Sequence, residues 1–180
     1  VDVLSMTAFE RAHAGLYLAM QYPTEVPGVP VLDVLEAAFR ASGRDATEVA
    51  GLITAEAERI GFDDKFLLRA MNVDLSGGEK KRNETLQLGV LRPAIAILDE
   101  LDSGLDVDAL RACSRRIEQA TNETGLGVLA ITHYSRLLHE LRPDHVHVLA
   151  RGAIQLSGGP ELAVELESTG YAAFGEDVPA

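Results

Sequence analysis

The chain has 180 residues and is 47% hydrophobic, enough for a globular domain with a sizeable core. Its 28 acidic residues outnumber 16 basic ones and give a formal net charge of −12. This excess disfavours binding to nucleic acid or to an anionic membrane, because both require clustered Lys and Arg. The short basic run Lys80–Arg82 is interpreted as a solvated patch.

One cysteine, Cys113, excludes an internal disulfide, fits a reducing compartment and is expected to pack as a small apolar residue on a helix. No apolar run approaches the ~20 residues of a membrane span, and no signal peptide opens the chain. These features predict a cytoplasmic protein without direct membrane insertion.

The first third of the chain predicts a helical turn at 10–13, a short buried strand at 16–21 and then a loop, since Pro23, Pro27 and Pro30 forbid a helix. Helices are predicted over 31–41 and 47–60, the second after Asp45 as candidate N-cap, with a helical pattern continuing over 66–71. Because no strand pattern appears between Pro30 and Val73, this stretch is predicted to be an all-helical subdomain inserted in an α/β protein.

After a glycine turn, a helix is predicted over 79–91, ended by Pro93. Short apolar strands then alternate with helices. The strands are 95–98, 128–131, 146–149 and 154–156, and the helices are 107–121, 136–141 and 160–167. This alternation favours a largely parallel, doubly covered sheet, with an irregular tail over 170–180.

Two segments carry the chemistry. Leu75-Ser76-Gly77-Gly78-Glu79 is a glycine-rich turn opening a helix, where backbone N–H groups can bind phosphate oxygens. The apolar strand 95–98 is followed directly by Asp99 and Glu100. Asp99 can hold Mg²⁺, and Glu100 can polarise a water that attacks the γ-phosphate of ATP.

Three further residues follow predicted strands or turns. Gln21 ends the first strand and can touch the Mg²⁺ or the attacking water, and His133 follows strand 128–131 and can hydrogen-bond the γ-phosphate. Asp106 closes the turn Ser103-Gly104-Leu105-Asp106 and is a candidate N-cap for the next helix. This turn is also a candidate interface with an opposite subunit, and the two roles are compatible.

In chain order these motifs are the glutamine at 21, the glycine turn at 75–79, the Asp-Glu pair at 99–100, the turn at 103–106 and the histidine at 133. In this order they resemble the motifs of ABC-family ATPases, and the resemblance covers residues 3–170. A closer resemblance is to the SufC family, the ATPases of the SUF iron–sulfur cluster assembly system. It rests on the runs Gly15–Pro23, Pro27–Val29, Asn72–Val73, Ser76–Asn83, Asp99–Asp106 and Thr132–Tyr134. The resemblance implies a P-loop NTPase-like ABC fold, ATP and Mg²⁺ as cofactors, and an ATP-dependent homodimer. It further implies SufB/SufD-like scaffold proteins as partners, with nucleotide-driven dimerisation reshaping the scaffold and Tyr22–Pro30 as the contact region.

The chain departs from the family in lacking a G-x-x-x-x-G-K-[ST] phosphate loop. We therefore expect an N-terminally truncated chain that by itself binds ATP weakly, hydrolyses none and leaves apolar strand faces uncovered. Lys80 or Lys81 is also expected to pair with Glu100 in an isolated subunit.

The predicted divisions are a remnant of the ATPase core with the glutamine loop (1–30), the helical subdomain with the LSGGE motif (31–91), the ATPase core proper (92–158), and a C-terminal helix and tail (159–180). Two alternatives remain open: the ATP-binding subunit of an ABC transporter, and a non-catalytic interaction fragment. A chromosome-maintenance ATPase is disfavoured, because the segment between Gln21 and Leu75 is short and has no heptads.

Overall fold

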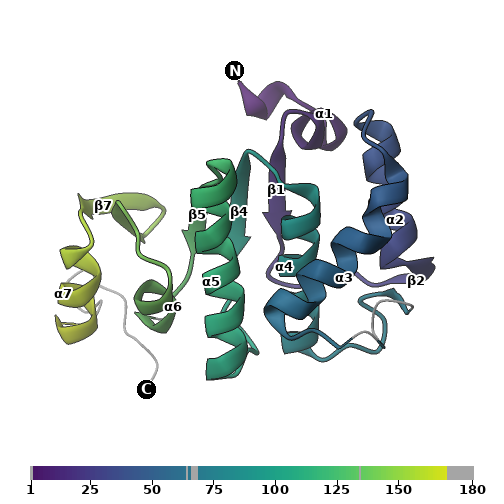
Figure 1. Ribbon diagram of the computed structural model, residues 1–180. Coiled ribbons are helices and arrows are strands. Elements are labelled where there is room, and N and C mark those ends of the chain that lie inside the picture. The colour runs from purple at the N-terminus through teal and green to yellow at the C-terminus, as the bar shows by residue number, and fades with distance from the viewer. Residues whose placement is uncertain (1, 64, 66–68, 134, 170–180) are drawn as a thin grey trace. The chain divides into compact units, whose positions relative to one another are not determined.

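The computed structural model describes residues 2–63, 65, 69–133 and 135–169 (Figure 1). Residues 66–68 of the helical pattern predicted over 66–71, and the tail predicted over 170–180, lie outside these residues. The chain divides into two compact units, Val1–Thr132 and His133–Ala180. The positions of the two units relative to one another are not determined, and each is described by itself.

The first unit contains a parallel three-stranded sheet in the order β1 (Leu16–Ala19), β4 (Ile95–Asp99), β5 (Gly127–Ile131). Leu18 lies beside Ile97, and Ile97 beside Leu129, so all three strands end at one edge of the sheet. This parallel arrangement confirms the predicted α/β class. It also brings the residues that follow each strand to the edge where such sheets bind ligands.

The two faces of this sheet differ in burial. On one face Ala96 and Leu98 are buried, and Tyr17 reaches helix α4 (Gly77–Leu91), beside which α5 (Val107–Thr124) packs (Figure 1). The opposite face is apolar and about half exposed, with exposed fractions of 51% for Leu18 and 53% for Leu129. Within the described residues of the first unit, the expected double cover of this sheet is absent, and the apolar face expected to be uncovered is exposed.

Helices α2 (Val31–Ala41) and α3 (Val49–Ile60) pack against α4. Their buried residues recur at the helical period and form one core with α4: Val31, Leu35, Phe39, Val49, Ile53, Ala57, Ile60, Leu86 and Val90. A short 3-10 turn (Ala46–Glu48), capped by Asp45, leads into α3.

Two short strands accompany these helices. One lies in the predicted proline loop and the other in the stretch predicted to be all-helical, so both predictions are corrected. β2 (Val26–Pro30) pairs antiparallel with β3 (Ala70–Met71). The prolines do exclude a helix from 26–30, but they leave the backbone extended and able to pair. β3 has only two residues, too few to show an alternating pattern.

Helix α4 ends at Leu91, as predicted, but begins at Gly77 within the glycine turn and not at the predicted position 79. Ser76 is the N-cap and forms a capping box with Glu79, and Arg92 ends the helix in a left-handed conformation (φ +52°) just before Pro93. The capping box satisfies two backbone N–H groups that the first turn of a helix leaves unpaired. The first turn of α4 is thereby fixed.

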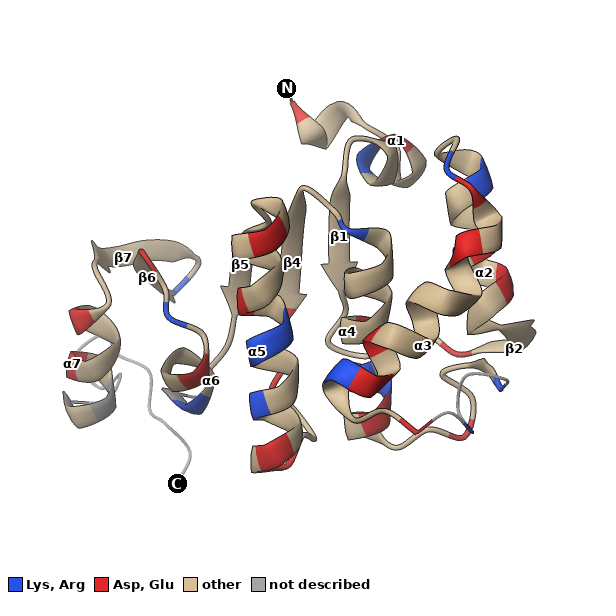
Figure 2. Ribbon diagram, viewed as in Figure 1, with Lys and Arg blue, Asp and Glu red and all other residues tan. Residues whose placement is uncertain are grey.

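The remaining elements are short. η1 (Val3–Ser5) and α1 (Ala8–His13) precede β1, and the second unit consists of α6 (Ser135–Glu140), an antiparallel pair β6 (Val146–Ala150) and β7 (Ala153–Gly158), and α7 (Glu161–Thr169). Acidic positions occur on α2, α3, α5 and α7, in keeping with the net charge (Figure 2). None of the helices in the described residues is both long and apolar enough to cross a membrane.

Candidate functional site

Two of the predicted catalytic residues meet at the edge where the strands end. Gln21 follows β1 and Glu100 follows β4, and the Gln21 Nε2 atom donates a hydrogen bond of 2.9 Å to Glu100 Oε2. The residues are 79 positions apart in the sequence and come together because β1 and β4 are parallel neighbours.

The backbone of Glu100 is strained and held from both sides. Its φ of +48° lies in the left-handed region, which costs a residue with a side chain of the order of 1–3 kcal/mol. The Glu100 N–H donates to the Ile131 carbonyl (2.9 Å), and its carbonyl accepts from Ser103 N–H (3.1 Å). These bonds hold the Glu100 carboxylate at the sheet edge.

The predicted metal ligands offer oxygen atoms, which suit Mg²⁺. Asp99 closes β4 with a half-buried side chain, and within the described residues the amide oxygen of Gln21 accepts no hydrogen bond. The described part of the chain holds no cluster of three or more His, Cys, Asp or Glu side chains that could hold a metal. Mg²⁺ in phosphate sites commonly has one or two protein ligands beside phosphate oxygens and water, so this donor set fits it.

The basic run is not a solvated patch. Lys81 is 2% exposed, and its Nζ atom donates to the carbonyls of Met20 (2.5 Å) and Asp99 (2.9 Å). It lies 3.8 Å from the carboxylate of Glu84. Burial lowers the pKa of Lys81, although Glu84 and the carboxylates at 99, 100 and 102 oppose this shift.

Lys80 has a different partner. Its Nζ atom lies 2.7 Å from the Glu25 carboxylate. Within the described residues, neither Lys80 nor Lys81 forms an ion pair with Glu100, so the expected pairing is absent. The Lys81 ammonium is instead bound by the carbonyls of Met20, which follows β1, and Asp99, which closes β4.

The glycine turn at 76–79 packs against the turn at 103–106. Glu79 N–H donates to Ser76 Oγ (3.3 Å) and Ser76 N–H donates to Glu79 Oε2 (2.7 Å), bonds that lower the pKa of Glu79. A Cβ atom added at Gly78 would lie 2.7 Å from the Gly104 carbonyl oxygen, so only a glycine fits at position 78 without a shift. Asp106 accepts from Ala109 N–H (2.7 Å), which confirms it as the N-cap of α5.

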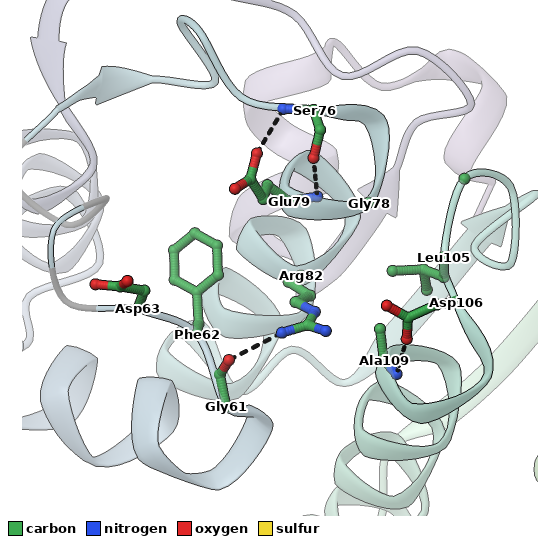
Figure 3. A pocket seen from close by; sticks show the side chains of 11 residues that line it. Gly61, Phe62, Asp63, Ser76, Gly78, Glu79, Arg82, Leu105, Asp106 and Ala109 are labelled. Atoms are coloured by element: carbon green, nitrogen blue, oxygen red, sulfur yellow. Dashed lines mark hydrogen bonds between the residues drawn. The ribbon is translucent and has the colours of Figure 1, made fainter.

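A pocket of about 240 Å³ opens beside these two turns (Figure 3). Its described lining comes from three neighbouring segments: Gly61, Phe62, Asp63; Ser76, Gly78, Glu79, Arg82; and Gly104, Leu105, Asp106, Ala109. Sequence reasoning missed 61–63 and Arg82. The Arg82 Nη1 atom donates to the Gly61 carbonyl (2.9 Å), and the basic run was the signal that could have identified it.

The predicted histidine lies at the start of the second unit. His133 is exposed, and its placement relative to Glu100 is not described. The preceding residue belongs to the first unit, where Thr132 Oγ1 donates to Asp102 Oδ1 (3.2 Å). Cys113 is fully buried on α5, as predicted, and burial raises the pKa of its thiol.

No protein-family model matches the chain. Among characterised proteins it is similar to a probable ATP-dependent transporter of Synechocystis, with 45% identity over 99% of this chain and 72% of that protein. It is 47% identical to vegetative protein 296 of Bacillus subtilis, over 94% of this chain and 67% of that protein. It is 44% identical to a probable ABC transporter ATP-binding protein of Streptococcus pyogenes, over 99% of this chain and 71% of that protein.

Among solved structures the fold is similar to that of a dimeric ABC transporter cassette (TM-score 0.72, 16% identity, 86% of this chain and 68% of that one). It is also similar to a post-hydrolysis dimer of such a cassette bound to ADP and phosphate (TM-score 0.73, 16% identity, 87% and 68%). At this identity the likeness concerns the fold alone.

Proposed function

The chain belongs to the family of ABC ATP-binding proteins, and we propose that it acts in ATP hydrolysis that drives a cytoplasmic iron–sulfur cluster assembly scaffold. The observation that carries the enzymatic part is the 2.9 Å hydrogen bond between Gln21 and Glu100 at the ends of two parallel strands. This pair combines a carboxylate that can orient water with an amide that fixes the carboxylate's position.

In the proposed mechanism Glu100 accepts a hydrogen bond from the attacking water and holds it in line with the γ-phosphate. Gln21 Nε2 holds Glu100 Oε2 and thereby restricts the rotation of the carboxylate. Asp99 and the amide oxygen of Gln21 would hold Mg²⁺, which when bound neutralises phosphate charge. Such catalysis depends on positioning and electrostatic stabilisation.

The glycine turn would serve a nucleotide on a second copy of the protein. The backbone N–H groups of Ser76, Gly77 and Gly78 stand at the beginning of α4, where the helix dipole favours an anion. The Glu79 carboxylate is occupied by the capping box and would fix the turn rather than bind phosphate itself. Asp106 would act through the turn at 103–106. His133, in the second unit, is proposed by itself as a contact to the γ-phosphate.

The assembly role is supported by sequence features around this site. The run Ser76–Asn83 and the loop Tyr22–Pro30 resemble those of SufC-type ATPases, and the structure gives the basic run a specific use in burying Lys81. Tyr22 is 80% exposed next to Gln21, so a SufB/SufD-like scaffold that contacted Tyr22–Pro30 would be coupled to the catalytic pair.

Two experiments test the proposal. ATP turnover of the protein purified from its own cells should be abolished by Glu100→Gln while ATP-dependent dimerisation remains. Turnover that survives this substitution would refute the role of Glu100. Affinity purification followed by mass spectrometry should recover SufB- or SufD-like proteins.

The second candidate function is that of a transporter's ATP-binding subunit, which the names of the Synechocystis and Streptococcus relatives favour. Recovery of a membrane permease in the same purification, without a scaffold protein, would establish this alternative. The proposed catalytic residues would keep their roles.

A further inference from the structure

The loop that carries Gln21 is attached to helix α4 along its length. Met20 N–H donates to Glu84 Oε1 (2.8 Å), and the Met20 carbonyl accepts from Lys81 Nζ (2.5 Å). Farther along the loop, Glu25 pairs with Lys80 (2.7 Å). Because Met20 directly precedes Gln21, its two bonds fix the backbone from which the catalytic amide extends.

A second set of contacts, through two buried asparagines, supports the same loop. The Thr24 carbonyl accepts from Asn72 Nδ2 (2.9 Å), and Asn72 Oδ1 in turn accepts from Asn83 Nδ2 (2.8 Å). Asn72 and Asn83 are both buried. Polar side chains of α4 therefore hold the loop directly at Met20 and at Glu25. At Thr24 they hold it indirectly, through Asn72.

Glu84 is the least expected of these residues. Its carboxylate is buried (6% exposed), and burial raises its pKa to about 7 despite the attraction of Lys81. Within the described residues, its Oε2 atom has no hydrogen-bond partner. Burying a carboxylate with an unpaired oxygen costs free energy. If residue 84 served only to pack the helix, an apolar side chain would therefore be favoured there.

The helix backbone at Glu84 is also anchored to the sheet. Tyr17 of β1 donates from its hydroxyl to the Glu84 carbonyl (2.9 Å). Tyr17 and Met20 thus belong to the same strand-to-loop segment and contact the same residue of α4. This double contact fixes the distance between the helix and the end of β1.

We propose that Glu84 is a positioning residue for the Gln21–Glu100 pair, acting through its hydrogen bond to the Met20 amide. The inference rests on the proposed function for its catalytic consequence. Since the same helix begins with the glycine turn, Glu84 also connects that turn to the loop carrying Gln21.

The test uses nuclear magnetic resonance on the full chain, labelled with ¹³C and ¹⁵N. The wild-type protein should show a through-hydrogen-bond coupling between the Met20 amide nitrogen and the Glu84 carboxyl carbon. Glu84→Met removes the acceptor at similar volume, so Met20 amide exchange should accelerate about tenfold or more. The Gln21 side-chain amide resonance should move at the same time.

Three variants make the comparison specific. Glu84→Gln keeps an acceptor oxygen and should leave Met20 exchange within about threefold of wild type. Glu84→Asp shortens the side chain by one methylene and should accelerate Met20 amide exchange. This variant replaces Glu84→Met in the test if Glu84→Met does not fold. Glu58→Met, at an exposed position of α3, is the matched control and should change neither signal.

Absence of the coupling in the wild-type protein would overturn the proposal, as would a folded Glu84→Met variant that left the Gln21 resonance in place. Where ATP turnover is measurable, Glu84→Met should lower kcat with little change in KM, and an unchanged kcat would also overturn it. Absence of turnover in the protein purified from its own cells would contradict the proposed function alone, because the resonance measurements do not require ATP.

Discussion

A buried ion pair joins helix α3 to helix α5, and its removal should be costly. Glu56 and Arg116 are each 3% exposed and form a bidentate contact, in which Arg116 Nη2 lies 3.0 Å from Glu56 Oε1 and Arg116 Nε donates to Glu56 Oε2. A Cβ atom at Gly89 of α4 would overlap this carboxylate, so all three helices meet at the pair.

Arg116→Met should destabilise the protein by about 3 kcal/mol. Breaking a buried pair typically costs about 3–5 kcal/mol, because one charge is left uncompensated. The lower end applies here, since Arg59 Nη1 lies 3.4 Å from Glu56 and retains part of the compensation. The double variant Glu56→Leu/Arg116→Met removes both charges and should recover most of the loss.

Urea denaturation followed by circular dichroism gives the four free energies of unfolding that this double-mutant cycle needs. The matched control is the surface pair Glu36–Arg40, whose side chains are 28% and 64% exposed and whose coupling should not exceed about 0.5 kcal/mol. A loss below about 1 kcal/mol for Arg116→Met would refute the reasoning, as would a double variant as unstable as the sum of the single ones.

Three further outcomes are expected. Gly78→Ala should lower the thermal midpoint of unfolding and reduce the free energy of unfolding by about 1–3 kcal/mol, because the new methyl group would overlap the Gly104 carbonyl oxygen. An unchanged midpoint would contradict the observed packing. The pKa of Glu84, raised from 4.5 to about 7, means that the folded state binds the proton more tightly. Stability should therefore fall by up to about 3 kcal/mol as pH rises from about 4.5 to about 7, and Glu84→Gln should flatten this dependence in denaturation curves. Leu129→Thr should reduce light scattering at high protein concentration, because it makes the exposed sheet face less apolar, and equal scattering would count against that face as the cause.

Much of the fold could be predicted because its signals are local. The capping box at Ser76, the stop at Pro93 and the helical spacing of Val31, Leu35 and Phe39 all act within a few residues of the chain. The same is true of Asp106, whose role as N-cap depends on the next three residues. Patterns of this kind specify helices and strands without reference to distant segments.

The contacts of the candidate site could not be predicted from the sequence. Lys81 appears exposed in the sequence because a run of basic residues is usually solvated, yet its partners Met20 and Asp99 are 61 and 18 positions away. The uncovered face of the central sheet could not be read from its strands, since apolar side chains on both faces favour double cover. β3 exists only through its pairing with β2.

The contact between Gly78 and Gly104 has a consequence for how this sequence can diverge. The two turns contact each other through backbone atoms where they are closest. Both residues at this contact are glycines, so neither can be replaced by a smaller residue. A replacement on one side cannot be compensated by a smaller residue on the other, so it requires the loop path at 103–106 to change. Relatives that carry a side chain at position 78 should therefore also differ in the length or conformation of the second turn, and the two motifs should change together or not at all.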